Sequence, residues 1–120
     1  MAVLNNNKNI QSWKLALMRN LASDLINYEK LVLTLKRAKL LQVYMEKLIT
    51  IAKQETLHAH RQVNNYLRNV KTTKTITVSK KLFTVLLLKF KQRQGGYTKI
   101  LKLNQPRKGD NATLAIIQFS

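Results

Sequence analysis

The chain has 120 residues, of which 45% are hydrophobic, and its 22 Lys and Arg against 5 Asp and Glu give a formal net charge of +17. That size and apolar content suit one packed core rather than a disordered basic tail, and the absence of cysteine excludes disulfides, thiolate nucleophiles and Cys-ligated metals. Such an excess of positive charge repels itself, so we expect a polyanionic partner, with nucleic acid first and an anionic membrane second.

The amino end differs in composition from the rest of the chain. Residues 1–11 show no helical or strand periodicity, and four of them are asparagines. We expect a flexible or RNA-ordered arm here, followed by a single RNA-binding domain over residues 12–120. The arm lacks an apolar segment of signal-peptide length, and the longest strongly apolar run, residues 85–88, is far shorter than the about 20 residues of a membrane-spanning helix. A cytoplasmic protein is therefore expected.

Two amphipathic helices with a strand between them are predicted in the first half. The first helix begins after Ser12, a suitable N-cap, and its apolar residues recur at helical spacing: Leu15, Met18, Ala22 and Leu25. The apolar, β-branched run at residues 30–35 favours a strand. Thr34 can then cap a long helix whose buried face holds Ala38, Leu41, Met45, Leu48 and Ala52. The opposite face of this helix is basic: Lys36, Lys39, Lys47 and Lys53.

Two further helices are predicted on either side of a basic loop. The third begins after Thr56, buries Val63, Leu67 and Val70, and carries Arg61 and Arg68 on one side, seven residues apart. Residues 71–80 do not alternate and are expected to form the loop. The fourth helix is expected to start at Ser79 as N-cap and to bury one wide stripe: Leu82, Phe83, Leu86, Leu87 and Phe90. Gly95 and Gly96 are expected to end it, the first in the left-handed conformation.

The last part of the chain predicts two strands, residues 97–103 and 112–119, paired antiparallel around a turn-rich loop at residues 104–111. The predicted order is helix, strand, three helices, two strands. This order indicates an α+β fold in two layers, with a small three-stranded sheet packed against helices.

The segment around Gly95, Gly96 and Tyr97 is a candidate phosphate site. Two glycines let the backbone approach a phosphate chain, Tyr97 could stack on a splayed base, and Lys99 and Lys102 could neutralise phosphates. An ordinary helix C-cap followed by a core tyrosine explains the same residues equally well, and the spacing leaves both readings open.

The loop between the last two strands offers two cations, Arg107 and Lys108, at a tip that can enter a groove of folded RNA. Asp110 is expected to close the turn rather than to act as a catalyst, because one lone carboxylate is poor material for acid–base chemistry.

Other chemistry-bearing residues favour structural interpretations. His58 and His60 have only Glu55 as a possible third metal ligand, so an exposed pair near RNA is favoured over a metal centre. The helical aromatics Trp13 and Tyr28 are predicted to pack in the core. Serines and threonines stand in no triad-like context, and no phosphate-binding GxxxxGK[ST] motif occurs, so we expect no enzyme, no cofactor and no small-molecule substrate.

Segments spread over nearly the whole chain resemble the bacterial large-subunit ribosomal protein seventeen family. They are residues 17–22 (LMRNLA), Thr34, 37–39 (RAK), 48–53 (LITIAK), Arg61, 81–83 (KLF), 95–103 (GGYTKILKL), Arg107 and 109–112 (GDNA). Each piece alone is weak, and their order along the chain makes the joint match specific. The family usually opens with an Arg- and His-rich tail, from which the Asn-rich residues 1–11 depart.

The resemblance implies a small protein with three strands and about four helices that binds large-subunit ribosomal RNA near the outer end of the peptide exit tunnel. It also implies neighbouring large-subunit ribosomal proteins as partners and a bacterial rather than organellar ribosome. Contact residues carried over by position are Arg19, Arg37, Lys39, Lys53, Arg61, Gly95, Gly96, Tyr97, Lys99 and Arg107. Further RNA-binding candidates are basic residues, together with one polar residue from the segment that follows Gly95 and Gly96 and one from the loop at residues 104–111: Lys14, Lys36, Arg68, Lys80, Thr98, Lys102, Lys108 and Asn111.

Two functions from other classes remain open at this point. A free-standing DNA-compacting or regulatory protein would need a dimer seam or a recognition helix, and neither is clear in the sequence. A membrane-surface binder would need uninterrupted amphipathic helices, whereas these helices alternate with strands and their apolar stripes have the width of a core face.

Overall fold

A computed structural model describes residues 2–68 and 77–120, with side chains described from residue 12 onward. The first half comprises α1 (Ala2–Tyr28), β1 (Lys30–Thr34), α2 (Leu35–Ala52) and α3 (Leu57–Tyr66). These four elements follow the predicted order of helix, strand and two helices.

One continuous helical stretch and two strands make up the second half. The stretch consists of α4 (Val78–Lys81), the π-helical turn η1 (Leu82–Leu86) and α5 (Leu87–Phe90). The strands are β2 (Thr98–Lys102) and β3 (Leu114–Phe119). The α+β fold with its small sheet is thus confirmed, and the fourth predicted helix corresponds to α4, η1 and α5 together.

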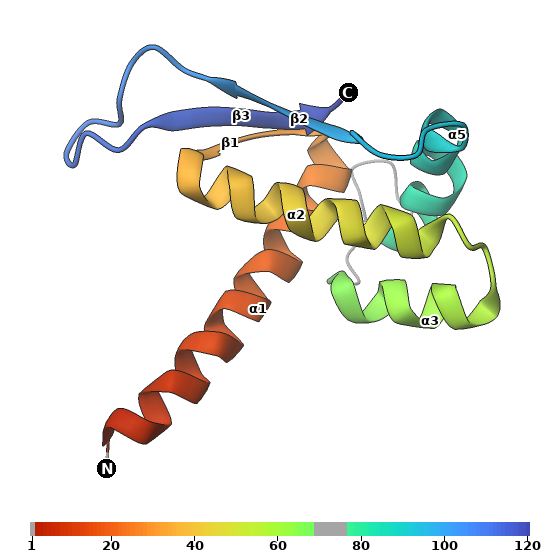
Figure 1. Cartoon of the computed structure of the whole chain (residues 1–120), viewed down its shortest axis with the longest axis horizontal. Coiled ribbons are helices and arrows are strands. Elements are labelled where there is room, and N and C mark those ends of the chain that lie inside the picture. Colours follow the sequence, from red (N-terminus) through yellow and green to blue (C-terminus); the bar gives the residue numbers. More distant parts are fainter. Residues whose placement is uncertain (1, 69–76) are drawn as a thin grey trace.

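The sheet has the strand order β1-β3-β2, and both pairs are antiparallel. β2 and β3 form the predicted hairpin, and β1 adds to the other edge of β3. Ala115, Ile117 and Phe119 of β3 are buried toward the helices, and α2 runs along this side of the sheet (Figure 1). On the other face Ile116 stands between Val32 and Leu101, both about half exposed.

Threonine hydroxyls mark the starts of three helices. Thr34 accepts a hydrogen bond from the Arg37 backbone N–H at 3.4 Å, as the predicted cap does, and Thr56 accepts one from Ala59 at 3.1 Å. The last helical stretch is capped by Thr77 and not by Ser79 as predicted. The helix starts earlier because Val78 is fully buried and belongs to its first turn.

α1 differs from its prediction at the amino end. Its backbone is helical from Ala2 and not from Ser12, while the expected mobility of the arm stays a prediction. Among the side chains described from Ser12 onward, burial begins near Met18, and the earlier part of the helix projects away from the sheet (Figure 1). Leu15 and Trp13, which the helical stripe assigned to the core, are 52% and 57% exposed, and Tyr28 is also exposed.

The last helical stretch contains a π-helical turn between two α-helical turns. The Leu87 backbone N–H donates to the carbonyl of Leu82, five residues earlier, so one extra residue enters the turn. Leu82, Leu86, Leu87 and Phe90 are all buried, as predicted, while Phe83 is partly buried.

Two predicted helix ends are wrong. α3 ends at Tyr66 and Leu67 is extended, so Arg68 does not share a helix face with Arg61. α5 ends at Phe90, so Gly95 is not its cap. In the following loop it is Gly96 that has the positive φ of 67°. Val63 and Leu67 are buried as expected, whereas Val70 and most of the predicted basic loop lie outside the described residues.

Candidate nucleic-acid interface

The first turns of α2 present three exposed cations, Lys36, Arg37 and Lys39. The N-cap Thr34 fixes where α2 begins, and the buried Ala38 sets which face turns outward. These cations carry no compensating acid on their own turn, since α2 has no acidic residue in its first turn. A concentrated positive surface results at this end of the helix.

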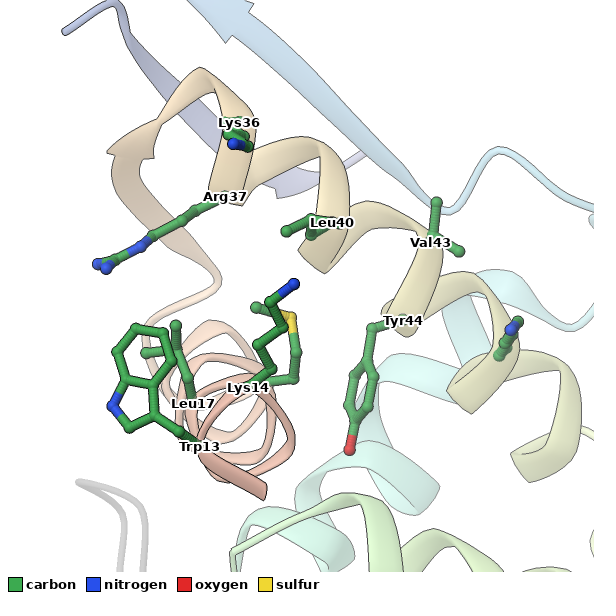
Figure 2. Close-up of a pocket in the computed structure, with 10 residues that line it drawn as sticks. Trp13, Lys14, Leu17, Lys36, Arg37, Leu40, Val43 and Tyr44 are labelled. Carbon is green, nitrogen blue, oxygen red and sulfur yellow. The ribbon is translucent and has the colours of Figure 1, made fainter. Parts of the chain in front are cut away.

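α1 brings further groups to the same surface. Lys14, together with Trp13, lines a groove of about 480 Å³ between α1 and α2, which Lys36 and Arg37 line from the other side (Figure 2). The predicted cation Lys14 therefore lies on the same groove as Lys36 and Arg37, although it precedes them by more than twenty residues in the sequence.

The loop between β2 and β3 lies at the same end of the molecule (Figure 1). The Leu35 backbone N–H donates to the carbonyl of Thr113 at 2.8 Å, which ties the start of α2 to the strand that follows this loop. Lys36 and Lys39 line a shallow depression with Thr113 and Ala112. The exposed Lys108 and Arg107 of the loop thus extend the α2 surface.

The tip of this loop is closed by its acid, as predicted. Asp110 accepts hydrogen bonds from the Arg107 side chain, with Nε 3.1 Å from Oδ1, and from the Ala112 backbone N–H at 3.2 Å. Asn111 and Gly109 have positive φ values of 55° and 108°, which the tight reversal requires. Asp110 offsets the charge of Arg107, so Lys108 carries the excess charge of the tip.

The Arg107–Asp110 pair gives a pH-dependent prediction. The hydrogen bond from Arg107, and secondly that from Ala112, lowers the pKa of Asp110 from 3.8 to about 2. A depressed pKa in the folded chain means that the stabilisation is present above pH 4 and is lost as the pH falls through about 2. An NMR titration of the Asp110 carboxyl carbon is expected to show a midpoint near 2, and Arg107→Ala is expected to raise it. A midpoint near 3.8 in both proteins would contradict the pairing.

The structure places Tyr97 and Thr98 inside the protein. Tyr97 is 2% exposed, and its ring packs edge-on against Phe90 with centroids 5.3 Å apart. Its backbone N–H donates to the carboxylate of Glu46 at 3.0 Å, and Thr98 is also buried. The base-stacking role predicted for Tyr97 is therefore corrected to core packing, because the ring is covered by its own chain.

Lys53 is also drawn inward. Its ammonium group donates to the Tyr97 hydroxyl at 3.0 Å and to the carbonyl of Arg93, and lies 5.2 Å from the centre of the tyrosine ring. At the carboxyl end of α2 it is half-buried and stabilises the loop that leads into β2, and its contact with RNA stays a prediction. Gly95 and Gly96 in that loop are exposed, and a Cβ at either position would meet nothing within 4 Å. Their backbone is open to a partner.

Arg19 and Arg68 are placed on one side of α1. The hydroxyl of the buried Ser23 accepts a hydrogen bond from the Arg68 backbone N–H at 2.8 Å. The Arg68 guanidinium donates a hydrogen bond to the Asn20 side chain at 3.1 Å. Arg19 is exposed on the preceding turn. Burial raises the pKa of the Tyr44 phenol to about 12. The positive charge of Arg19 partly opposes that rise.

The remaining candidates are exposed on separate elements. Arg61 lies on α3, Lys80 on α4, and Lys99 and Lys102 on β2. His60 stacks on Phe83 with ring centroids 3.8 Å apart. Within residues 2–68 and 77–120 no cluster of three or more His, Asp or Glu residues could hold a metal ion, and no helix is long and apolar enough to cross a membrane.

Two residues of this surface were missed by the sequence interpretation. Trp13 was assigned to the core, yet it is exposed and the Arg37 guanidinium lies 5.9 Å from the centre of its ring. Lys47 was recognised only as part of a basic face, yet it lines the same groove. The spacing did contain a signal for Trp13. Trp13 and Leu17 are four residues apart and share a helix face, whereas Leu15 lies on nearly the opposite side of the helix.

Comparisons with known proteins extend over most of the chain. The family model described as Ribosomal protein L17 matches residues 17–120, from the middle of α1 through β3. The large ribosomal subunit protein bL17 of Mesoplasma florum is 49% identical over 108 residues, which cover 90% of each chain. The bL17 of Mycoplasma capricolum is 46% identical over the same length and coverage. That of Persephonella marina is 47% identical over 104 residues, covering 87% of this chain and 80% of its own.

Proposed function

The chain belongs to the ribosomal protein L17 family of non-catalytic structural proteins of the large ribosomal subunit, and from that premise we propose that it binds large-subunit ribosomal RNA by phosphate neutralisation and shape. The observation that carries this proposal is a net charge of +17 on a folded chain, with one group of exposed cations, Lys14, Lys36, Arg37 and Lys39, gathered where α1 meets the first turns of α2. A compact protein with this charge is stabilised beside a dense polyanion, which replaces the repulsion among its own cations with attraction.

The proposed contact surface is centred on the first turns of α2 and the loop between β2 and β3. Its side chains come from α1, α2 and the loop: Lys14, Lys36, Arg37, Lys39, Arg107, Lys108 and Asn111. The exposed backbone at Gly95 and Gly96 can approach phosphates closely, and Arg19, Arg61, Arg68, Lys80, Lys99 and Lys102 extend the contact over other faces. Lys53 and Tyr97 bind each other at the carboxyl end of α2, where they stabilise the loop that contains Gly95 and Gly96, and Thr98 is buried next to Tyr97.

Salt dependence tests this mode of binding. If about 8 to 10 phosphates are neutralised, the logarithm of the affinity for large-subunit ribosomal RNA should fall with the logarithm of salt concentration at a slope of about −6 to −9. Filter binding of the full chain over a range of salt concentrations measures the slope. A slope near zero, or equal affinity for duplex DNA, would contradict the proposal, and the second result would favour a DNA-compacting protein.

The position within the ribosome is a second part of the proposal. We place the protein near the outer end of the peptide exit tunnel of a bacterial cytoplasmic ribosome, beside other large-subunit proteins, on the strength of its family membership. Sedimentation of a lysate through a high-salt sucrose cushion should leave the protein with the large subunit. Cross-links from its lysines to ribosomal proteins remote from the tunnel exit would contradict this position.

A further inference from the structure

We propose that the groove between α1 and α2 binds an RNA nucleotide whose base has left its stack, with the base against Trp13 and the flanking phosphates on the surrounding cations. This inference rests on the proposed function and adds a specific base site to it. It rests on three properties of the groove: its apolar walls, an exposed indole paired with a guanidinium, and a rim of cations without acids.

The walls of the groove are apolar. Trp13 and Leu17 of α1 and Leu40, Val43 and Tyr44 of α2 line it, and Figure 2 shows Trp13 and Leu17 on the side of α1 nearest Arg37. Leu40 and Val43 are both about half exposed, so within the described residues this surface is not covered by the protein's own core. A phosphate group alone gains nothing from such walls, whereas the flat apolar face of a base does.

Trp13 is the residue that favours a base. It is the chain's single tryptophan, it is 57% exposed, and the Arg37 guanidinium lies 5.9 Å from its ring centre. Indole rings and guanidinium planes are the surfaces on which unstacked bases are held in RNA-binding proteins. The pair therefore forms a stacking platform at the mouth of the groove.

The rim provides the charges that the flanking phosphates require. Lys14, Lys36, Arg37 and Lys47 line the groove from two helices, and none of its described lining residues is acidic. The nearby Glu46 accepts a hydrogen bond from the Tyr97 backbone N–H at 3.0 Å. Cations on both sides of an apolar slot match a base with a phosphate on either side of it.

An acidic, partly apolar protein segment is the competing occupant. The groove, at about 480 Å³, has the size of a small-molecule pocket rather than of an extended trough for a helix. The presence of the aromatic–guanidinium pair also favours a planar ligand over aliphatic side chains. We therefore assign the groove to a nucleotide.

Because Trp13 is the chain's single tryptophan, its fluorescence reports on this site alone. A short single-stranded oligouridylate and an oligoadenylate should quench it on binding to the full chain, whereas inorganic polyphosphate of equal charge should bind without comparable quenching. Stacking of one base contributes about 1 to 3 kcal/mol, so filter binding, which does not need the fluorophore, should show that Trp13→Ala weakens oligonucleotide binding about 5- to 150-fold. Trp13→Tyr should restore most of the affinity.

Leu15→Ala is the matched control, because Leu15 is similarly exposed on the same helix but does not line the groove. It should leave oligonucleotide affinity unchanged. Equal quenching by polyphosphate, unchanged affinity in Trp13→Ala, or quenching only by an acidic apolar peptide would each overturn the base site. In those cases the affinity for whole ribosomal RNA should still fall with salt concentration as proposed above. Loss of that salt dependence would instead overturn the proposed function itself.

Discussion

Replacing Phe90 with alanine is expected to lower the free energy of unfolding by about 3 to 5 kcal/mol. Phe90 is fully buried at the end of α5, and its ring contacts Tyr97 and Phe119 with centroid distances of 5.3 and 5.6 Å. It therefore joins the last helix to β3 and to the residue that directly precedes β2. Alanine has the higher helix propensity, so the loss comes from packing and the cavity left behind.

Urea denaturation followed by circular dichroism measures this change, and Leu88→Ala is its control. Leu88 lies on the same short helix and is 73% exposed, so its truncation should change stability by less than about 0.5 kcal/mol. Equal effects of the two substitutions would mean that α5 packs against the sheet through a different face.

The triple variant Lys36→Ala, Arg37→Ala, Lys39→Ala is expected to have the largest effect on RNA binding. It removes three neighbouring exposed cations from the first turns of α2. If each contributes about 0.5 to 1 kcal/mol, the affinity should fall about 10- to 100-fold, and the salt slope should become shallower by about 2 to 3. Alanine is a good helix former, so the fold should be kept.

A second triple variant separates position from total charge. Lys30, Lys89 and Lys91 are exposed and lie outside the groove and the α2 surface, and changing all three to alanine lowers the net charge by the same amount. This variant should retain most of the affinity. If filter binding shows the two triples to be equally weakened, RNA association depends on net charge alone and the proposed surface is wrong.

Local periodicity explains which parts of the fold were predictable. In α2 the buried residues Ala38, Leu41, Met45, Leu48 and Ala52 recur three and four apart, so one core face follows from helix geometry alone. The same reasoning failed in α1 at Leu15, which is exposed. Helical spacing predicts which face of a helix is apolar, but it does not predict how far along the helix the rest of the protein covers that face. The π-helical turn at Leu82–Leu86 likewise has no separate signal in the spacing.

The candidate site was predictable in its chemistry and less so in its geometry. Excess lysine and arginine indicated a polyanion, and Asp110 closes its turn as expected because that hydrogen bond is local. Tyr97 and Lys53 were assigned to the RNA surface, but they bind each other across 44 positions of sequence and stabilise the interior. Trp13 was assigned to the core, although its stripe faces the groove.

By itself the sequence determined the net charge, the family, the order of helices and strands, and the antiparallel hairpin, because these depend on composition, motifs and contacts between near neighbours. The tertiary structure alone decided that β3 lies between β1 and β2, that Tyr97 is buried, and that Trp13 meets Arg37 across a groove. Those outcomes depend on which distant segments pack together, and that is set by the whole core rather than by any one stretch of sequence.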